Sequence, residues 1–209
     1  MRIDEDERID LGSFEVRSGL VNITDPCYEA DGKCNAIKQR AKRGLWSAEA
    51  LMSSGRVAVL RASCKGYDFR NLNRTISDDI GVDSGQAGIF DSAFYPEGET
   101  GEFEDKTSFY GRVCELTCPT PKEGEEREYP AGGVTENGVV SCSGYGDGCY
   151  IATGAYDGDE LVAIEIDFGL LEQPECPNCG CAVDNEGELC YDCQAEEDEE
   201  NERDDEDED

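Results

Sequence analysis

The chain has 209 residues, of which 50 are acidic and 18 basic, with no histidine and a formal net charge of −32. This charge repels nucleic acids and anionic membrane surfaces, so direct binding to either is not expected. The lack of histidine excludes serine–histidine and cysteine–histidine catalysis, and the lack of any run of 18 apolar residues predicts no membrane span.

The acidic residues are concentrated at the two ends of the chain. Residues 1–10 form a short acidic N-terminal extension, and residues 195–209 contain twelve carboxylates against Arg203 alone, a net charge of −11. So many like charges with so few apolar residues cannot bury enough surface to fold, so residues 195–209 are predicted to be a disordered acidic tail. By contrast, ten basic residues gather between Lys33 and Arg74.

Short apolar runs separated by glycine and aspartate cover residues 11–170 and predict a single mainly β domain of antiparallel strands. Ser13–Arg17 and Leu20–Thr24 alternate on either side of a Ser-Gly turn, which is typical of a hairpin. The next segment is ambiguous between helical and strand spacing. We expect a short helix or turn over Asn35–Arg43 and a strand that begins at Leu45.

The remaining expected strands follow in chain order. The last two strands of the chain form the clearest predicted hairpin, because their β-branched residues lie on either side of an Asp-Gly turn. The predicted strands are Arg56–Ala62, Ile80–Asp83, Gly88–Asp91, Phe109–Thr117, Cys149–Gly154 and Leu161–Phe168. Residues 171–175, which include Pro174, predict a linker after this domain.

Two Cys-x-x-Cys pairs follow the linker. Their spacing lets each pair form one tight turn around a shared tetrahedral Zn²⁺, and the four cysteines are Cys176, Cys179, Cys190 and Cys193. Four thiolates leave no open coordination position, so the zinc is expected to be structural, in a four-cysteine zinc ribbon within residues 171–194. The alternative is a set of ordinary buried or disulfide-bonded cysteines.

Twelve cysteines in all are typical either of a disulfide scaffold or of reduced thiols. The first residues are charged and include no apolar leader, so we expect a cytoplasmic protein with reduced thiols. Cys114 and Cys118 would share one face of their predicted strand. A second thiolate metal site and ordinary packing in the core are both open interpretations for such cysteines.

Three strings rich in glycine and aspartate occur in the β domain. They are Ser18-Gly19 with Thr24-Asp25-Pro26-Cys27-Tyr28, Gly81-Val82-Asp83-Ser84-Gly85-Gln86-Ala87-Gly88-Ile89-Phe90-Asp91, and Ser143-Gly144-Tyr145-Gly146-Asp147-Gly148-Cys149-Tyr150. Together, over about residues 11–170, they resemble an uncharacterised bacterial and phage family, the domain of unknown function numbered 4241. The resemblance implies one β-rich domain and brings no activity with it.

The candidate catalytic residues are three aspartates of these strings, Asp25, Asp83 and Asp147. Carboxylates that converge from loops can bind Mg²⁺ or Ca²⁺, or act as an acid–base pair. Aspartate also shapes tight turns by bonding its own backbone, and all three residues lie in turns beside glycine or proline. Ser84 and Ser143 are weak nucleophile candidates, because no histidine can serve as their base.

The sequence favours a non-catalytic cytoplasmic binding or adaptor protein of unknown biological role over an enzyme. In this interpretation the zinc ribbon and the acidic tail recruit a protein partner with a basic surface. One alternative is an Asp-based, divalent-metal-dependent hydrolase, which requires its three aspartates to converge in a pocket. A further alternative is a DNA mimic that inhibits a nucleic-acid-binding protein, which requires carboxylates spaced like phosphates on the folded body.

Overall fold

The computed structural model describes residues 8–29, 36–69, 74–119 and 130–170, and the single positions 178, 189, 193 and 194. The chain divides into one compact unit of residues 3–170 and another of residues 1–2 and 171–209. Of the predicted zinc ligands, only the buried Cys193 is described. Outside the described residues lie Cys176, Cys179, Cys190 and the acidic tail over residues 195–209.

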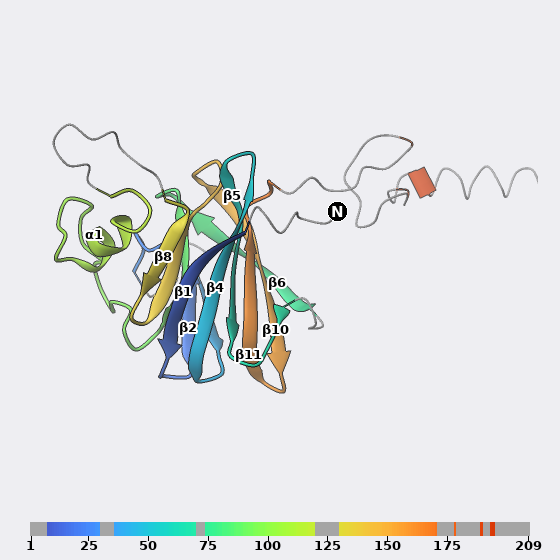
Figure 1. The fold of residues 1–209 in the computed structure, drawn as a ribbon, viewed down its shortest axis with the longest axis horizontal. Helices are drawn as coiled ribbons and strands as arrows, with labels where there is room; N and C mark the ends of the chain where they lie inside the picture. The colour runs from blue at the N-terminus through green and yellow to red at the C-terminus, as the bar shows by residue number, and fades with distance from the viewer. Residues whose placement is uncertain are drawn as a thin grey trace, which may run out of the picture. The chain divides into compact units, whose positions relative to one another are not determined.

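Within its described residues, the larger unit is built mainly of antiparallel strands in two sheets (Figure 1). The six-stranded sheet has the order β1 (Arg8–Val16), β4 (Gly44–Ser53), β5 (Arg56–Cys64), β11 (Glu160–Asp167), β10 (Gly148–Asp157) and β6 (Arg74–Val82). The five-stranded sheet has the order β3 (Ile37–Arg40), β2 (Leu20–Thr24), β7 (Gln86–Asp91), β9 (Gly138–Cys142) and β8 (Gly132–Thr135). The mainly β, antiparallel fold expected from the sequence is confirmed.

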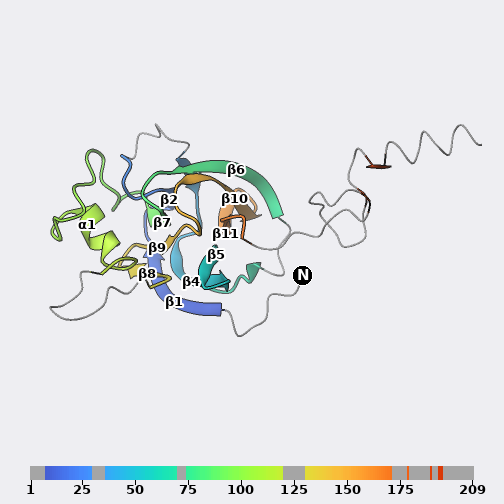
Figure 2. The same ribbon diagram turned by 90° about the horizontal axis from the view of Figure 1, so that it is seen from above.

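The two sheets enclose one hydrophobic core, around which the strands curve when the domain is seen from above (Figure 2). Both sheets contribute fully buried side chains, among them Phe14 and Trp46 from the first sheet and Ile23 and Ile89 from the second. Alternation along each strand places these residues on the inner faces. At the sides, β1 contacts β8 and β9, and β6 contacts β2, so the sheets wrap the core as a flattened barrel.

Helix α1 (Phe109–Cys114) packs on the outer face of the five-stranded sheet. Its Phe109 ring lies 5.4 Å from Phe90 of β7 and 4.9 Å from Tyr95, measured between ring centroids. This aromatic cluster fixes the segment that follows β7 against the sheet. No helix among the described residues combines the length and the apolar character that a membrane span requires.

The predicted hairpins have different outcomes. β10 and β11 pair as expected, and Gly158 adopts a φ of +63° in their turn. Ser13–Arg17 and Leu20–Thr24 lie within strands, but the hairpin between them is wrong, because β1 belongs to the six-stranded sheet and β2 to the five-stranded sheet. The intervening Ser18-Gly19 turn carries the chain from one sheet to the other.

Two other local predictions are corrected near the N-terminal end. The helix expected over Asn35–Arg43 is wrong, since Ile37–Arg40 form strand β3 and pair with β2. That pairing supplies hydrogen bonds that the local sequence does not reveal. Strand β1 begins at Arg8, so the last residues of the predicted extension over residues 1–10 belong to the sheet.

The strand predicted over Phe109–Thr117 is also wrong, because this segment begins with helix α1. The Ser108 hydroxyl accepts a hydrogen bond from the Gly111 N–H at 2.9 Å and caps the helix N-terminus. Cys118 donates its backbone N–H to the Cys114 carbonyl at 2.7 Å. The two cysteines are therefore one helical turn apart and do not share the face of a strand.

Candidate functional site

Asp25 directly follows β2 and is completely buried. Its Oδ2 accepts hydrogen bonds from the backbone N–H groups of Asp83 and Ser84, at 2.8 and 2.7 Å. Its Oδ1 accepts the Ser84 hydroxyl at 2.6 Å and the Cys27 N–H at 2.8 Å. Four protein donors thus fill the roughly four lone-pair positions of this carboxylate.

The position of Asp25 follows from the path of the chain. Residues 83–85 form the turn in which the chain passes from β6 in one sheet to β7 in the other. The N–H groups of such a turn have no strand partner and need another acceptor. A carboxylate supplies charge-assisted hydrogen bonds, which are stronger than neutral ones, and Gly85 supports the turn with a φ of +69°.

The loop that contains Asp25 is also held by the segment after β7. The Tyr95 hydroxyl donates to the backbone carbonyl of Tyr28 at 2.7 Å. The Thr100 hydroxyl donates to the carbonyl of Cys27 at 3.0 Å. Because this loop is tied to neighbours on two sides, its conformation is set before any ligand arrives.

The third glycine-rich string lies against the same β6–β7 turn. The Ser143 N–H donates to the Gly85 carbonyl at 3.0 Å. A Cβ on Gly85 would lie 3.7 Å from the Cα of Gly146, and the Tyr150 hydroxyl donates to the Gly146 carbonyl at 2.7 Å. The three strings therefore meet at one end of the β domain. We call their connecting segments the motif loops: residues 25–28, 83–85 and 143–148.

Tyr145, at the tip of the third motif loop, is 74% exposed. The Arg56 guanidinium lies over its ring, 4.9 Å from the centroid, and also donates to the Gly144 carbonyl at 3.2 Å. Gly144 and Gly146 flank the tyrosine with φ angles of +61° and +109°, which glycine adopts without strain. The ring is thus presented to solvent and fixed from below by an arginine of β5.

Two titratable side chains lie beside Asp25. Burial, together with a hydrogen bond to the Asp25 carboxylate, raises the pKa of the Cys27 thiol far above its usual value. Burial and the nearby Cys114 thiol likewise raise the pKa of the Tyr110 phenol. Both groups keep their protons at neutral pH, so neither is prepared to act as a nucleophile or general base.

The three candidate aspartates lie in neighbouring loops but in different environments. Asp25 is buried, whereas the side chains of Asp83 and Asp147 are exposed. The Ser84 hydroxyl donates its proton to the Asp25 carboxylate. The Ser143 hydroxyl donates its proton to a backbone carbonyl. Within the part of the chain that the structure describes, no three Cys, Asp or Glu side chains are grouped so as to hold a metal ion.

The pairing of Tyr145 with Arg56 is the feature that sequence reasoning missed. The sequence does carry one signal for it, because an aromatic residue between two glycines in a polar turn has few neighbours that could bury it. Nothing local indicates Arg56, since it lies on β5, far from the loop in sequence.

The chain matches no protein-family model, no curated protein and no solved structure. The resemblance to the domain of unknown function numbered 4241 therefore stays a prediction.

Proposed function

We propose that this chain is a non-catalytic binding protein that recognises a protein partner through the motif loops, with Tyr145 as the anchor. One observation carries the proposal. The buried carboxylate of the motif loops is fully hydrogen-bonded inside the protein, while an aromatic ring of the same motif loops is exposed and held in place by Arg56. The geometry therefore supports recognition better than chemistry.

The alternative, a hydrolase based on Asp25, Asp83 and Asp147, is less well supported. Such an enzyme needs carboxylate oxygens that are free to bind a metal ion or exchange a proton with substrate. Withdrawing an oxygen of Asp25 from its bonds would leave a buried donor unpaired, at a cost of about 1–3 kcal/mol. Asp83 and Asp147 are exposed and lack the water-excluding surroundings that strengthen electrostatic catalysis.

The features of Tyr145 are those of an interface anchor. Tyrosine and arginine are among the residue types that contribute most to binding energy when an interface buries them. Arg56 and the flanking glycines set the ring orientation in the free protein. Less side-chain entropy is therefore lost when a partner covers the ring.

Charge indicates the kind of partner. Two exposed carboxylates, Asp83 and Asp147, belong to the same loops as Tyr145, and complementary charge at an interface favours a partner with a basic surface. The net charge of −32 adds a long-range attraction to such a partner.

The proposal extends to the C-terminal part of the chain. In a reducing cytoplasm, four thiolates at Cys-x-x-Cys spacing would hold a structural Zn²⁺, with the acidic tail over residues 195–209 adding to recruitment of the basic partner. The proposed zinc ligands are Cys176, Cys179, Cys190 and Cys193. Elemental analysis of the purified chain should give about one zinc per molecule, and a metal-free chain would contradict this part.

Site-specific photo-crosslinking tests the surface. The photoreactive residue p-benzoylphenylalanine is placed at Tyr145 in the full-length chain, which is then irradiated in a lysate of its native host. Phe94 is the matched control position, since it is 47% exposed and also lies under an arginine, with the Arg17 guanidinium 5.6 Å from its ring centroid.

We expect a discrete protein adduct at position 145 that weakens with added salt, and none at position 94. Tyr145→Ala should lose the same partner in affinity capture while its melting temperature stays close to that of the parent. Equal adducts at both positions, or none at position 145, would contradict the proposal.

A further inference from the structure

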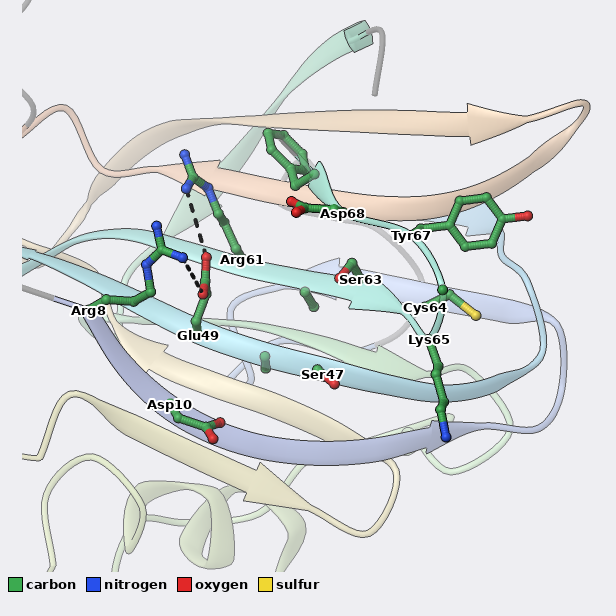
Figure 3. Close-up of a pocket in the computed structure, with 14 residues that line it drawn as sticks. Arg8, Asp10, Ser47, Glu49, Arg61, Ser63, Cys64, Lys65, Tyr67 and Asp68 are labelled. Carbon is green, nitrogen blue, oxygen red and sulfur yellow. Dashed lines mark ion pairs between the residues drawn. The ribbon is translucent and has the colours of Figure 1, made fainter. Parts of the chain in front are cut away.

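A pocket of about 590 Å³ lies on the outer face of the six-stranded sheet, over β1, β4 and β5 (Figure 3). The segment over residues 65–69, directly after β5, forms one wall. The volume lies within the range of roughly 300–1,000 Å³ that is usual for small-ligand sites. The pocket is built from residues other than those of the motif loops.

The pocket exists because small side chains lie side by side across the sheet. The strand register places Ser47 next to Ser13 on one side and Ser63 on the other, and Ser63 next to Ala163. Larger residues in this row would fill the space. Among the described residues, the hydroxyls of Ser47 and Ser63 have no hydrogen-bond partner in the protein, so both are available to a ligand.

The next row across the sheet is charged. Here Glu49 of β4 lies opposite Arg61 of β5, which in turn lies opposite Glu165 of β11. Arg61 forms ion pairs with both glutamates, at 3.8 Å with Glu49 and closer with Glu165. Arg8 also pairs with Glu49, at 3.4 Å, so these charges largely neutralise one another at one side of the pocket (Figure 3).

Two aromatic residues hold the wall in place. Phe69 packs on Ala155 and Ala163 on the outer face of the sheet, and the Arg61 guanidinium lies 5.3 Å from the Phe69 ring centroid. The Tyr67 hydroxyl hydrogen-bonds both a lysine ammonium and an aspartate carboxylate. The wall is thus fixed by packing and polar contacts before a ligand binds.

The charges that line the pocket balance. Its lining includes three cations, Arg8, Arg61 and Lys65, and three anions, Asp10, Glu49 and Asp68. Among the described residues, Lys65 and Asp10 have no ion-pair partner, which leaves one unpaired charge of each sign. A net attraction for an ionic ligand is therefore absent from the lining, and the −32 chain disfavours anions further.

We propose that this pocket binds a neutral polyhydroxylated ligand, namely a saccharide. A sugar hydroxyl donates and accepts at once, and the lining offers both donors and acceptors within one hollow. Donors come from Lys65 and the two serines, and acceptors from Asp10 and the same serines. A neutral ligand also needs no counter-charge, which matches the paired state of Arg61 and Glu49.

The test is an array of defined glycans probed with the full-length chain. It includes neutral oligosaccharides of glucose, galactose, mannose and N-acetylglucosamine, with sialylated and sulfated glycans for comparison. The best neutral binder is then titrated by calorimetry into the parent, S47F and S13F. Ser13 and Ser47 are neighbouring exposed serines in one row of the sheet, but only Ser47 lines the pocket.

We expect a neutral glycan to bind the parent and S13F equally, and S47F at least ~10-fold more weakly, because the phenylalanine fills the pocket. If S47F folds poorly, the test is the change in amide NMR shifts when the glycan is added to the parent. These changes should concentrate at Ser47, Ser63 and Lys65. No binding on the array, equal binding by S47F, or shifts confined to other regions would each overturn the proposal. Binding restricted to anionic glycans and weakened by salt would do the same.

Discussion

The two buried aspartates at opposite ends of the β2–β7 strand pair are built in the same way. Asp25 and Asp91 each accept, on Oδ1, the backbone N–H two residues further along the chain. Each also accepts, on Oδ2, two consecutive N–H groups of a turn in which the chain crosses between the sheets. For Asp25 this is the β6–β7 turn, and for Asp91 it is the β1–β2 turn at Arg17 and Ser18.

The comparison shows that a buried carboxylate is a structural element of this fold. A turn that leaves one sheet for the other carries N–H groups without strand partners, and an aspartate at a strand end supplies the acceptor. What differs is the surface beside each turn. The motif loops around Asp25 present Tyr145, which is 74% exposed. Close to Asp91, the less exposed Phe94 lies under Arg17, which pairs with Glu15 and Glu136.

Asp25→Ala should cause the largest loss of stability, at least about 3 kcal/mol in the free energy of unfolding. The substitution removes the acceptor of four donors, and each buried donor left unpaired costs about 1–3 kcal/mol. Asp91→Ala should cost less, because Asp91 accepts three backbone N–H groups, whereas Asp25 accepts three and, in addition, the Ser84 hydroxyl at 2.6 Å. Urea denaturation of the β domain measures both, and the reverse order would contradict the comparison.

Asp91→Asn should cost about 1.5–3 kcal/mol at neutral pH, the usual value of a hydrogen bond to a charged group. Burial alone would raise the pKa of Asp91, but hydrogen bonds from Ser18, Ala93 and Arg17 outweigh it and lower the pKa. The stabilisation is therefore complete above the unfolded-state pKa of about 3.9 and is lost as the pH falls through the lower folded-state pKa.

The difference in stability between the parent and Asp91→Asn should accordingly shrink below about pH 4. Denaturation curves recorded across the acid range check this dependence. A difference that grows on acidification would show that the carboxylate is not stabilised in its charged form.

Ser84→Ala should have an intermediate effect of about 1 kcal/mol, since one hydroxyl bond to Asp25 is lost while both backbone bonds remain. Thermal unfolding of this variant and of Ser18→Ala sharpens the comparison. Ser18 donates its hydroxyl to the Leu20 carbonyl at 3.0 Å, and Asp91 keeps its three backbone donors when that hydroxyl is removed, so the replacement should cost less. A neutral Ser84→Ala would mean that the short bond to Asp25 contributes nothing.

Tyr145→Ala should change stability least, by less than about 1 kcal/mol, because the ring is 74% exposed and its contact with Arg56 is an exposed cation–π interaction. Circular-dichroism melting measures this change. A large loss would place Tyr145 in the fold rather than at an interface and would remove the anchor from the proposed function.

Local patterns predicted the elements whose pairing is local. The β10–β11 hairpin has β-branched strands and an Asp-Gly turn, and the sequence contains all that determines it. The alternation of β1 and β2 could also be recognised in the sequence. Their partner strands could not, because the pairing of β1 with β4, and of β2 with β3 and β7, depends on burial in a core that two sheets share.

The sequence predicted which aspartates belong to the candidate site, but not the contacts that hold the site together. Asp25, Asp83 and Asp147 were recognisable as turn residues, and the local bond from Cys27 to Asp25 follows from that pattern. The stronger interaction, between Asp25 and a turn 58 residues away, depends on the chain crossing between sheets. The pocket over β1, β4 and β5 was not predictable, since the row of Ser47 and Ser63 appears only once the strand register is known.

In the interpretation given above, Asp25 is a structural carboxylate rather than a metal ligand or a catalytic group. The most direct test is the thermal unfolding of the parent, expressed in medium with added zinc, in the presence of millimolar Mg²⁺, Ca²⁺ or Mn²⁺, alongside an Asp83→Asn/Asp147→Asn variant. If Asp25 is structural, the shifts in melting temperature should be smaller than ~1 °C in both proteins. A clear rise in the melting temperature of the parent that disappears in the variant would contradict a structural role for Asp25. Such a result would instead support the alternative of a metal-dependent hydrolase.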